Sequence, residues 1–245
     1  MLNACNSHGG SICCPPALAM AGVKDMNVWA NRILFIDGEA IVIDKPAGLA
    51  VHPGPKTRDS LEDHLADLRF GFHRTPSPVH RLDRDTSGCL LLSRHPKAHR
   101  RFARAFEEDK VEKTYLAVLA GVPAAEEGRV DLALAKVSSR DEGWRIRPDP
   151  AGKTAATSWR VVDEKAGRAL VLFRPETGRT HQLRVHAADG IGIPISGDPV
   201  YGDGRGPMLL HALTLRVERE NKAAIEARAP LPPSFAHVGF ADGGD

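Results

Sequence analysis

Cysteine is scarce in this chain of 245 residues, and its four cysteines form no C-x-x-C pair: Cys5, Cys13, Cys14 and Cys89. Their spacing fits neither a disulfide framework nor a zinc site. A reducing compartment, the cytoplasm, is therefore the location that we predict. Cys89 begins an apolar run, which favours a small core residue over a nucleophile.

Long apolar runs are also lacking. No run approaches the roughly 18 residues that a membrane-spanning helix needs, and no basic segment followed by an apolar core marks a secretory signal at the N-terminus. We therefore expect no membrane contact. A heptad pattern is absent too, so a monomer is the expected state.

A large net charge is missing as well, since the formal charge is only +2, with 42% apolar and 26% charged residues. These are ordinary values for a globular protein, and the chain is long enough to bury a sizeable core. Residues 1–27 combine Gly and Pro pairs with no clear period, which predicts a disordered leader. No low-complexity linker divides the rest, so residues 28–240 are expected to form one domain.

Positive charge is nevertheless concentrated in one segment. From Arg69 to Lys113 there are 11 Lys or Arg and 6 Asp or Glu residues, and from Arg94 to Arg104 five basic residues and no acid. Such a stripe suits contact with phosphates. A solvated helix face would give the same pattern, and charge alone leaves both readings open.

Short β-type runs dominate the pattern of the chain. The runs at 33–36 and 40–43 are joined by Asp37-Gly38, a hairpin signal. Further strands are predicted at 89–92, 114–119, 129–134, 155–162, 168–173, 209–217 and 224–228. Helices are predicted over 60–69, from Pro96 onward, and over 180–188 with Gly190 as its stop. Many strands joined by turns, with few helices, predict an α+β fold with a largely antiparallel sheet.

The densest polar cluster is HRLDRDTSG at residues 80–88, between a Pro-rich loop and an apolar strand. Loops on a rigid scaffold often carry catalytic groups. The cluster offers two carboxylates flanked by arginines, and an opposite charge within about 4–6 Å lowers the pKa of a carboxyl group. An ionised carboxylate can serve as nucleophile or base. Composition alone favours the alternative of a surface turn with an ion pair.

A second polar cluster, GRTHQLRVH, occupies residues 178–186. His181 and Arg184 are three apart on the predicted helix and so share a face, and Gly178 permits a close backbone approach. An amphipathic helix with a polar outer face remains an alternative. His181 and His186 are five apart and no H-E-x-x-H is present, so no metal site is expected.

From about residue 30 to 230 the chain resembles the RluA-like family of RNA pseudouridine synthases. The resemblance rests on segments in the family's order: IVIDKPAGL at 41–49, HRLDRDTSG at 80–88, EKTYLA at 112–117, GRTHQLRVH at 178–186 and GDPVYG at 197–202. It implies the pseudouridine-synthase fold, in which helices and loops flank a mixed, largely antiparallel sheet with a central active-site cleft. Residues 28–240 would then be the catalytic domain.

The resemblance also implies the roles of particular residues. Asp83 matches the catalytic aspartate, Tyr115 the tyrosine that packs against the target base, and Arg184 the arginine that pairs with the aspartate. A buried structural tyrosine is the alternative for Tyr115. The residues expected to bind substrate are His80, Arg81, Arg84, Thr86, Arg179, His181 and Gln182.

The activity implied is isomerisation of uridine to pseudouridine in tRNA or ribosomal RNA, without a cofactor. The N1–C1′ bond breaks, the uracil turns, and C5 joins C1′. No small RNA-binding domain is recognisable before residue 30, which favours a target read by the catalytic domain alone, such as a tRNA stem-loop or a ribosomal hairpin.

Two other functions are kept open at this point. A non-catalytic RNA-binding or RNA-folding module would explain the basic segment but not the joint presence of Asp83, Tyr115 and Arg184. A hydrolase using Asp83 and Asp85 is less consistent with the sequence, because residues two apart in a turn do not straddle a glycosidic bond.

Overall fold

A computed structural model describes residues 28–54, 57–139 and 143–241 of the chain. The leader predicted over residues 1–27 lies outside these residues. The elements in chain order are η1 (Ala30–Arg32), β1 (Ile33–Ile36), β2 (Ala40–Lys45), η2 (Leu61–His64), β3 (Ser77–Pro78), β4 (Ser87–Ser93), α1 (Pro96–Glu107), β5 (Val111–Leu119), β6 (Glu127–Asp131), β7 (Leu134–Ser139), β8 (Gly143–Pro148), β9 (Ala156–Lys165), β10 (Arg168–Pro175), α2 (Gln182–Val185), η3 (His186–Ile191), β11 (Leu210–Val217), β12 (Ile225–Arg228) and α3 (Pro233–Ala236).

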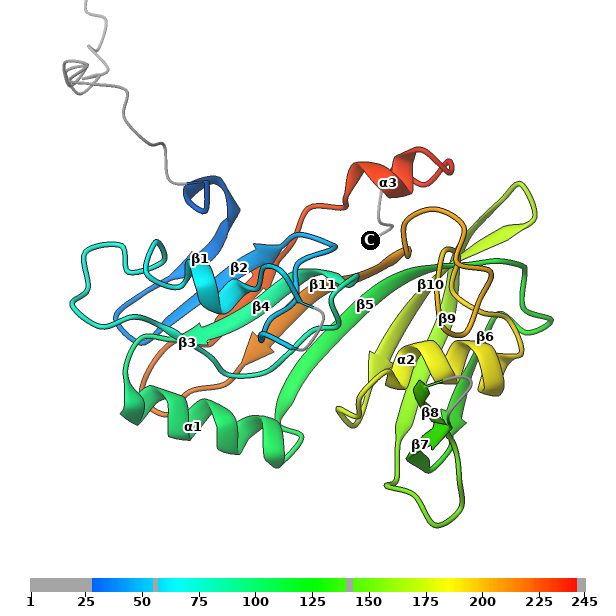
Figure 1. Cartoon of the computed structure of the whole chain (residues 1–245), viewed down its shortest axis with the longest axis horizontal. Coiled ribbons are helices and arrows are strands. Elements are labelled where there is room, and N and C mark those ends of the chain that lie inside the picture. The colour runs from blue at the N-terminus through cyan, green and yellow to red at the C-terminus, as the bar shows by residue number, and fades with distance from the viewer. Residues whose placement is uncertain (1–27, 55–56, 140–142, 242–245) are drawn as a thin grey trace, which may run out of the picture.

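One large sheet organises the described residues. Its main path runs β1-β2-β4-β11-β5-β10-β9-β6, with β3 beside β4 and β12 beside β11. Only the β4–β11 pair in this sheet is parallel among the described strands. Figure 1 shows α1 next to one half of the sheet and α2 next to the other. The predicted α+β class with a mixed, largely antiparallel sheet is confirmed.

The central strands are buried on both faces. Along β2, for example, Val42 joins the apolar cluster that contains α1, whereas Ile41 and Ile43 join a cluster on the opposite face. This period-2 alternation is what a strand between two packed layers requires. Helix α1 buries Ala98 and Phe102, as its predicted period required, and leaves its basic residues on the outside.

Two predicted helices differ from the structure. The segment after Ser60 forms only the 3-10 helix η2 and turns closed by bonds from i to i+3, although Leu61 and Leu68 are buried as expected. The later helix begins at Gln182, because His181 has a positive φ of 53°. It continues through the π-helical turn η3 to Gly192, so Gly190 does not stop it.

Gly190 instead allows close packing between η3 and β6. A Cβ atom there would lie 2.5 Å from a methyl group of Val130. The glycine is therefore required by the contact between η3 and β6. From the sequence alone, such a glycine cannot be distinguished from one that ends a helix.

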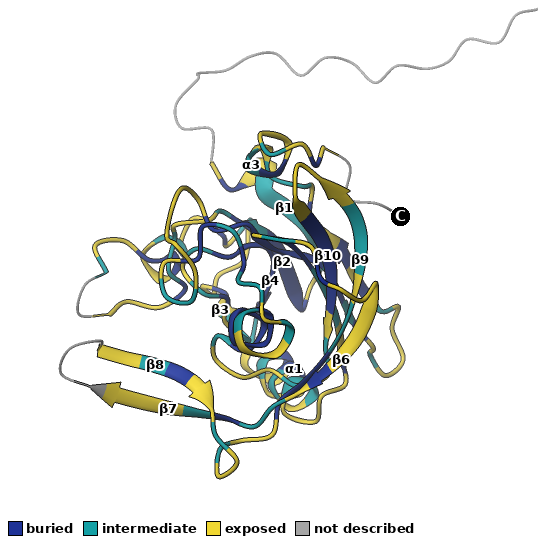
Figure 2. Cartoon of the chain, turned by 90° about the vertical axis from the view of Figure 1, so that its right-hand side faces the viewer, coloured by how far each residue is buried: buried dark blue, intermediate teal, exposed yellow. Residues whose placement is uncertain are grey.

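The hairpin formed by β7 and β8 was not predicted. It makes a separate two-stranded sheet, and Figure 2 shows it standing out from the body of the protein with most of its length exposed. Strand β8 alternates apolar Trp144 and Ile146 with basic residues, a strand signal that the sequence analysis overlooked, whereas β7 shows no such alternation. The short strand β3 and the short helix α3 were missed as well.

Gly88 joins the two halves of the large sheet. It pairs with Ala212 where β4 runs parallel to β11, and its φ is 103°. A Cβ at this position would lie 2.2 Å from the carbonyl oxygen of Ala212. Only glycine tolerates this conformation and this approach, which explains the glycine that ends the HRLDRDTSG segment.

We predict that Gly88→Ala lowers the free energy of unfolding by about 2–5 kcal/mol, because it adds backbone strain to a steric clash. Urea denaturation would measure the change. Gly38→Ala is the matched control, since its φ is not positive and a Cβ at Gly38 would meet nothing within 4 Å. Equal stability of the two variants would contradict this account.

Candidate active site

A cleft of about 420 Å³ opens between the 80–86 loop, β5 and the segment leading into α2. The structure brings nine of the ten predicted site residues to this cleft. They are His80, Arg81, Asp83, Thr86, Tyr115, Arg179, His181, Gln182 and Arg184. The predicted central cleft is therefore present, and only Arg84 lies outside it.

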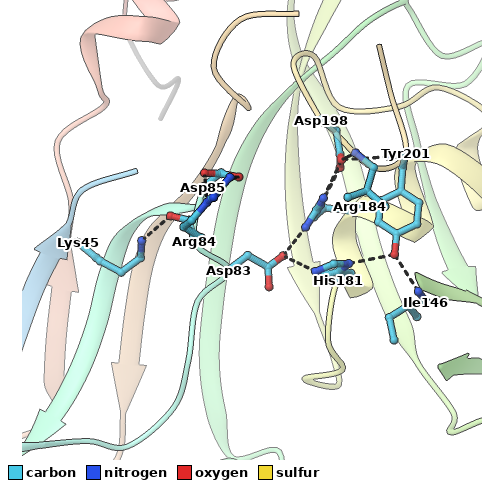
Figure 3. Close-up of polar contacts among 10 residues, drawn as sticks. Lys45, Asp83, Arg84, Asp85, Ile146, His181, Arg184, Asp198 and Tyr201 are labelled. Atoms are coloured by element: carbon cyan, nitrogen blue, oxygen red, sulfur yellow. Dashed lines mark hydrogen bonds and ion pairs between the residues drawn. The ribbon is translucent and has the colours of Figure 1, made fainter. Parts of the chain in front are cut away.

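Asp83 is held in the cleft by two residues from α2 and the turn before it. Arg184 Nη1 donates to Asp83 Oδ2 at 3.1 Å, and His181 Nε2 lies 3.8 Å from the same oxygen (Figure 3). The Asp83 side chain is 18% exposed and that of Arg184 6%. The carboxylate therefore reaches the cleft from a position that protein groups fix.

Arg184 is itself oriented by Asp198, a fully buried residue. Arg184 Nε and Nη2 each donate to one Asp198 oxygen at 2.7 Å, a bidentate pair that leaves Nη1 for Asp83. Burial opposes the charge on Arg184, but the hydrogen bonds and charge of Asp198, with the charge of Asp83, outweigh it and raise the pKa of the guanidinium. Arg184 is therefore a fixed cation at the base of the site.

Asp198 is satisfied on both sides. Burial alone would raise the pKa of its carboxyl group, but the hydrogen bonds and charge of Arg184 and two backbone N–H groups lower it. Those N–H groups belong to Val200 and Tyr201 and donate to Oδ1 at 2.8 and 3.1 Å. Backbone groups of the GDPVYG turn thus fix Asp198, which in turn orients Arg184.

His181 connects Asp83 to Tyr201. The Tyr201 hydroxyl oxygen accepts the backbone N–H of Ile146 at 3.0 Å and lies 3.0 Å from His181 Nδ1. Burial lowers the pKa of His181 despite the charge of Asp83, so the ring is neutral at pH 7. A neutral ring that accepts the hydroxyl hydrogen at Nδ1 carries its own hydrogen on Nε2, the nitrogen that faces Asp83.

Tyr115 lies on β5, in the same cleft as Asp83. Its ring packs against two of the apolar clusters that flank the sheet. Burial raises the pKa of the phenol, and the charge of Asp83 adds to the effect. Tyr115 therefore stays protonated near neutral pH and offers an aromatic surface, not a base.

Arg84 and Asp85, the two residues after Asp83, are not among the residues that line the cleft. Arg84 forms two hydrogen bonds to Asp85, at 3.0 and 3.1 Å, on the far side of the loop (Figure 3). The Arg84 side chain is 64% exposed. The two carboxylates of the 80–88 segment therefore have different surroundings, and only that of Asp83 meets Arg184.

Lys45 fixes this loop from inside. Its ammonium, on a fully buried side chain, donates to the carbonyl oxygens of Pro46, Leu49 and Arg84 at 2.7–3.0 Å. Burial lowers the pKa of Lys45 to about 7, while nearby carboxylates, Asp85 foremost, oppose the shift. Three acceptors match the three hydrogens of an ammonium, so Lys45 clamps the IVIDKPAGL segment to the loop that carries Asp83.

Three predicted substrate-binding residues are engaged by protein groups. His80 Nε2 accepts from Leu91 N at 3.0 Å while its ring stacks on Phe106, and burial lowers its pKa to about 3. Gln182 uses its whole amide on four protein partners, including Arg179 N and Ala156 O. Thr86 is buried and donates its N–H to the carbonyl oxygen of Asp83.

Sequence reasoning did not assign roles to Lys45, Asp198 or Tyr201, although all three lie within the quoted motifs. The available signal was that all three residues belong to motifs that the family resemblance had already marked. Their contacts depend on chain segments that are far apart in sequence, so spacing could not reveal them. Among the described residues, no group of three His, Cys, Asp or Glu side chains is arranged to hold a metal ion. Every helix of the described part is too short or too polar to cross a bilayer.

We predict that Asp198→Ala lowers the free energy of unfolding by about 3–5 kcal/mol, because it leaves the buried Arg184 charge without its main partner. Urea denaturation would measure the loss. Glu218→Ala removes only an exposed partner of Arg216 and serves as the control, with a loss below about 1 kcal/mol. A loss for Asp198→Ala as small as that of the control would mean that Arg184 does not depend on this anion.

Comparisons with known proteins identify the family of the chain. The sequence model of the RNA pseudouridylate synthase family matches residues 39–189. An uncharacterised RNA pseudouridine synthase of Zymomonas mobilis is 56% identical over 88% of this chain and all of that relative. Ribosomal large subunit pseudouridine synthase D of the same organism is 36% identical over 85% of this chain and 64% of its own length.

Solved structures give the same result. The human RNA pseudouridylate synthase domain-containing protein 4 superposes with a TM-score of 0.74 and 26% identity, over 86% of this chain and 93% of that one. The human domain-containing protein 1 gives a TM-score of 0.69 and 27% identity, over 83% and 85% of the two chains. The chain therefore belongs to the family of RNA pseudouridylate synthases, the isomerase family that its motifs predicted.

Proposed function

We propose that residues 28–240 form one catalytic domain that isomerises specific uridines in a folded tRNA or ribosomal RNA, with Asp83 as the catalytic carboxylate. The observation that carries the proposal is the placement of Asp83. Its carboxylate lies in the cleft and accepts a hydrogen bond from Arg184, whose other two guanidinium nitrogens bind the buried Asp198. Electrostatic preorganisation of this kind is a main source of catalysis.

The reaction requires an anion beside the ribose of the target nucleotide. The N1–C1′ bond breaks, the uracil turns within the cleft, and C5 bonds to C1′. C5 then gives up its hydrogen and N1 takes up a proton, so the product is an isomer and no oxidant or reductant is needed. Attack by Asp83 on C1′ and removal of the 2′ proton are two possible first steps, and both require an ionised carboxylate.

Tyr115 is proposed to pack against the target base. A base has to leave its stack to reach Asp83, at a cost of a few kcal/mol. Stacking on an aromatic ring contributes roughly 1–3 kcal/mol per base. A protonated phenol in the wall of a cleft of about 420 Å³ suits this contact, since the volume falls within the common range for small-molecule sites.

The RNA backbone is proposed to lie over the exposed basic residues at the rim. Arg81 and Arg179 line the cleft with exposed side chains, and Lys97 and Arg100 lie on the outer face of α1. We assign phosphate contacts to these residues, and positioning roles to His80, Thr86 and Gln182, whose polar groups bind protein. The relative named for the large ribosomal subunit makes ribosomal RNA the first substrate to test.

We predict that Asp83→Asn abolishes pseudouridine formation while RNA binding persists. Asp85→Asn, two residues away on the other side of the loop, should stay close to wild type because its partner is the exposed Arg84. Unmodified tRNA and ribosomal transcripts labelled with tritium at uridine C5 release tritium to water only when C5 forms its new bond. Tritium release by Asp83→Asn would refute the assignment. If neither the wild type nor the variants release tritium but all bind RNA, the result would favour a non-catalytic module.

A further inference from the structure

The β7–β8 hairpin exposes a tryptophan next to the cleft. Trp144 is 48% exposed, the largest exposed aromatic side chain among the described residues. It lies on β8, in the hairpin that stands out from the body in Figure 2. An exposed aromatic ring beside a cleft that binds RNA offers a surface on which a base can stack.

The face of the hairpin that carries Trp144 is turned toward the site. Trp144 pairs with Ser138 and Ile146 with Lys136, so these four residues share one face of the hairpin. Ile146 is buried, and the Trp144 ring centroid lies 5.1 Å from that of His181. The indole therefore borders the residue that faces Asp83.

Trp144 is absent from the residues that line the cleft. A base that occupied the cleft would meet Tyr115 and Asp83, whereas Trp144 stands outside it, next to His181. The indole is thus placed for the next nucleotide of a strand whose target base has entered the cleft.

The charge of the hairpin suits the same occupant. Lys136 Nζ lies 5.1 Å from the centre of the Trp144 ring. Lys136 lies on the same face of the hairpin as Trp144, whereas Arg145 and Arg147 lie on the opposite face. Residues 134–148 contain four basic and two acidic residues, with Asp141 and Glu142 between the two strands in sequence. Aromatic surface interleaved with basic residues is the pattern by which proteins hold single-stranded nucleic acid.

The hairpin is also connected to the catalytic groups. Ile146, two residues after Trp144, donates its backbone N–H to the Tyr201 hydroxyl, which lies 3.0 Å from His181 Nδ1. The hairpin and the ring that faces Asp83 therefore share one chain of hydrogen bonds. We infer that the β7–β8 hairpin is an RNA-binding arm and that Trp144 stacks on a nucleotide adjacent to the target uridine, an inference that rests on the proposed function.

The test compares Trp144→Ala with Trp144→Phe, in filter binding to unmodified tRNA and large-subunit ribosomal transcripts and in tritium release. Loss of one stacked base should weaken RNA binding about 5- to 150-fold in Trp144→Ala. KM should rise by a similar factor with a smaller change in kcat, because stacking outside the cleft binds ground state and transition state alike. Trp144→Phe keeps an aromatic ring and should stay within about threefold of wild type.

Tryptophan fluorescence gives a second readout. RNA should quench the emission of the wild type, and the part of the quenching that comes from Trp144 should vanish in Trp144→Phe although binding persists. Val137→Ala is the matched control, since Val137 is exposed on the opposite face of the same hairpin. It should leave binding and turnover unchanged.

Unchanged RNA affinity and quenching in Trp144→Ala would overturn the inference. A second outcome would also overturn it: the Trp144→Ala variant without RNA sediments with a different mass from the wild type, while its RNA affinity is unchanged. That result would assign Trp144 to a contact between protein molecules. These outcomes are separate from the Asp83 proposal, because binding is measured whether or not a transcript is converted. Turnover by Asp83→Asn would refute that proposal and leave the binding result intact.

Discussion

The site depends on one buried cation, Arg184, shared between two carboxylates. Its planar guanidinium presents donors in a fixed fork, and Asp198 occupies two of them, at 2.7 Å each. The remaining Nη1 then points in one direction only, toward Asp83. A buried charge is tolerated only when paired, so the same pairing that makes Arg184 compatible with the core also determines where the carboxylate of Asp83 stands.

The sheet brings these partners together from distant parts of the chain. Asp83 and Arg184 are 101 residues apart, and the loop of Asp83 enters β4 just where β4 pairs in parallel with β11. At that junction Ser87 Oγ lies 2.8 Å from His211 Nδ1, across 124 residues. The entropy of closing such long loops is offset by the buried core of the sheet. The site is therefore ordered by the fold before any RNA arrives.

The sequence predicted the elements whose signals are local, and it missed those that depend on distant contacts. Helix α1 was predicted because Pro96 marks its start and the apolar residues recur at helical spacing. The cleft residues followed from motif matches. The bend at His181 and the close packing at Gly190 depend on neighbours far away in sequence, so a helix pattern and a glycine were misread there. In the β7–β8 hairpin only β8 shows an alternating pattern, and that pattern is too short to stand out in the sequence.

His181 lies between the β7–β8 hairpin and Asp83. One ring nitrogen meets the Tyr201 hydroxyl, which also accepts the N–H of Ile146 in the hairpin, and the other faces Asp83. Lys45 restrains the Asp83 loop from the opposite side. Reacting groups misplaced by about 1 Å can lose rate about 100-fold. The surface proposed for the neighbouring nucleotide is therefore built on the same hydrogen-bonded groups that face Asp83, so the two parts of the site keep a fixed spacing.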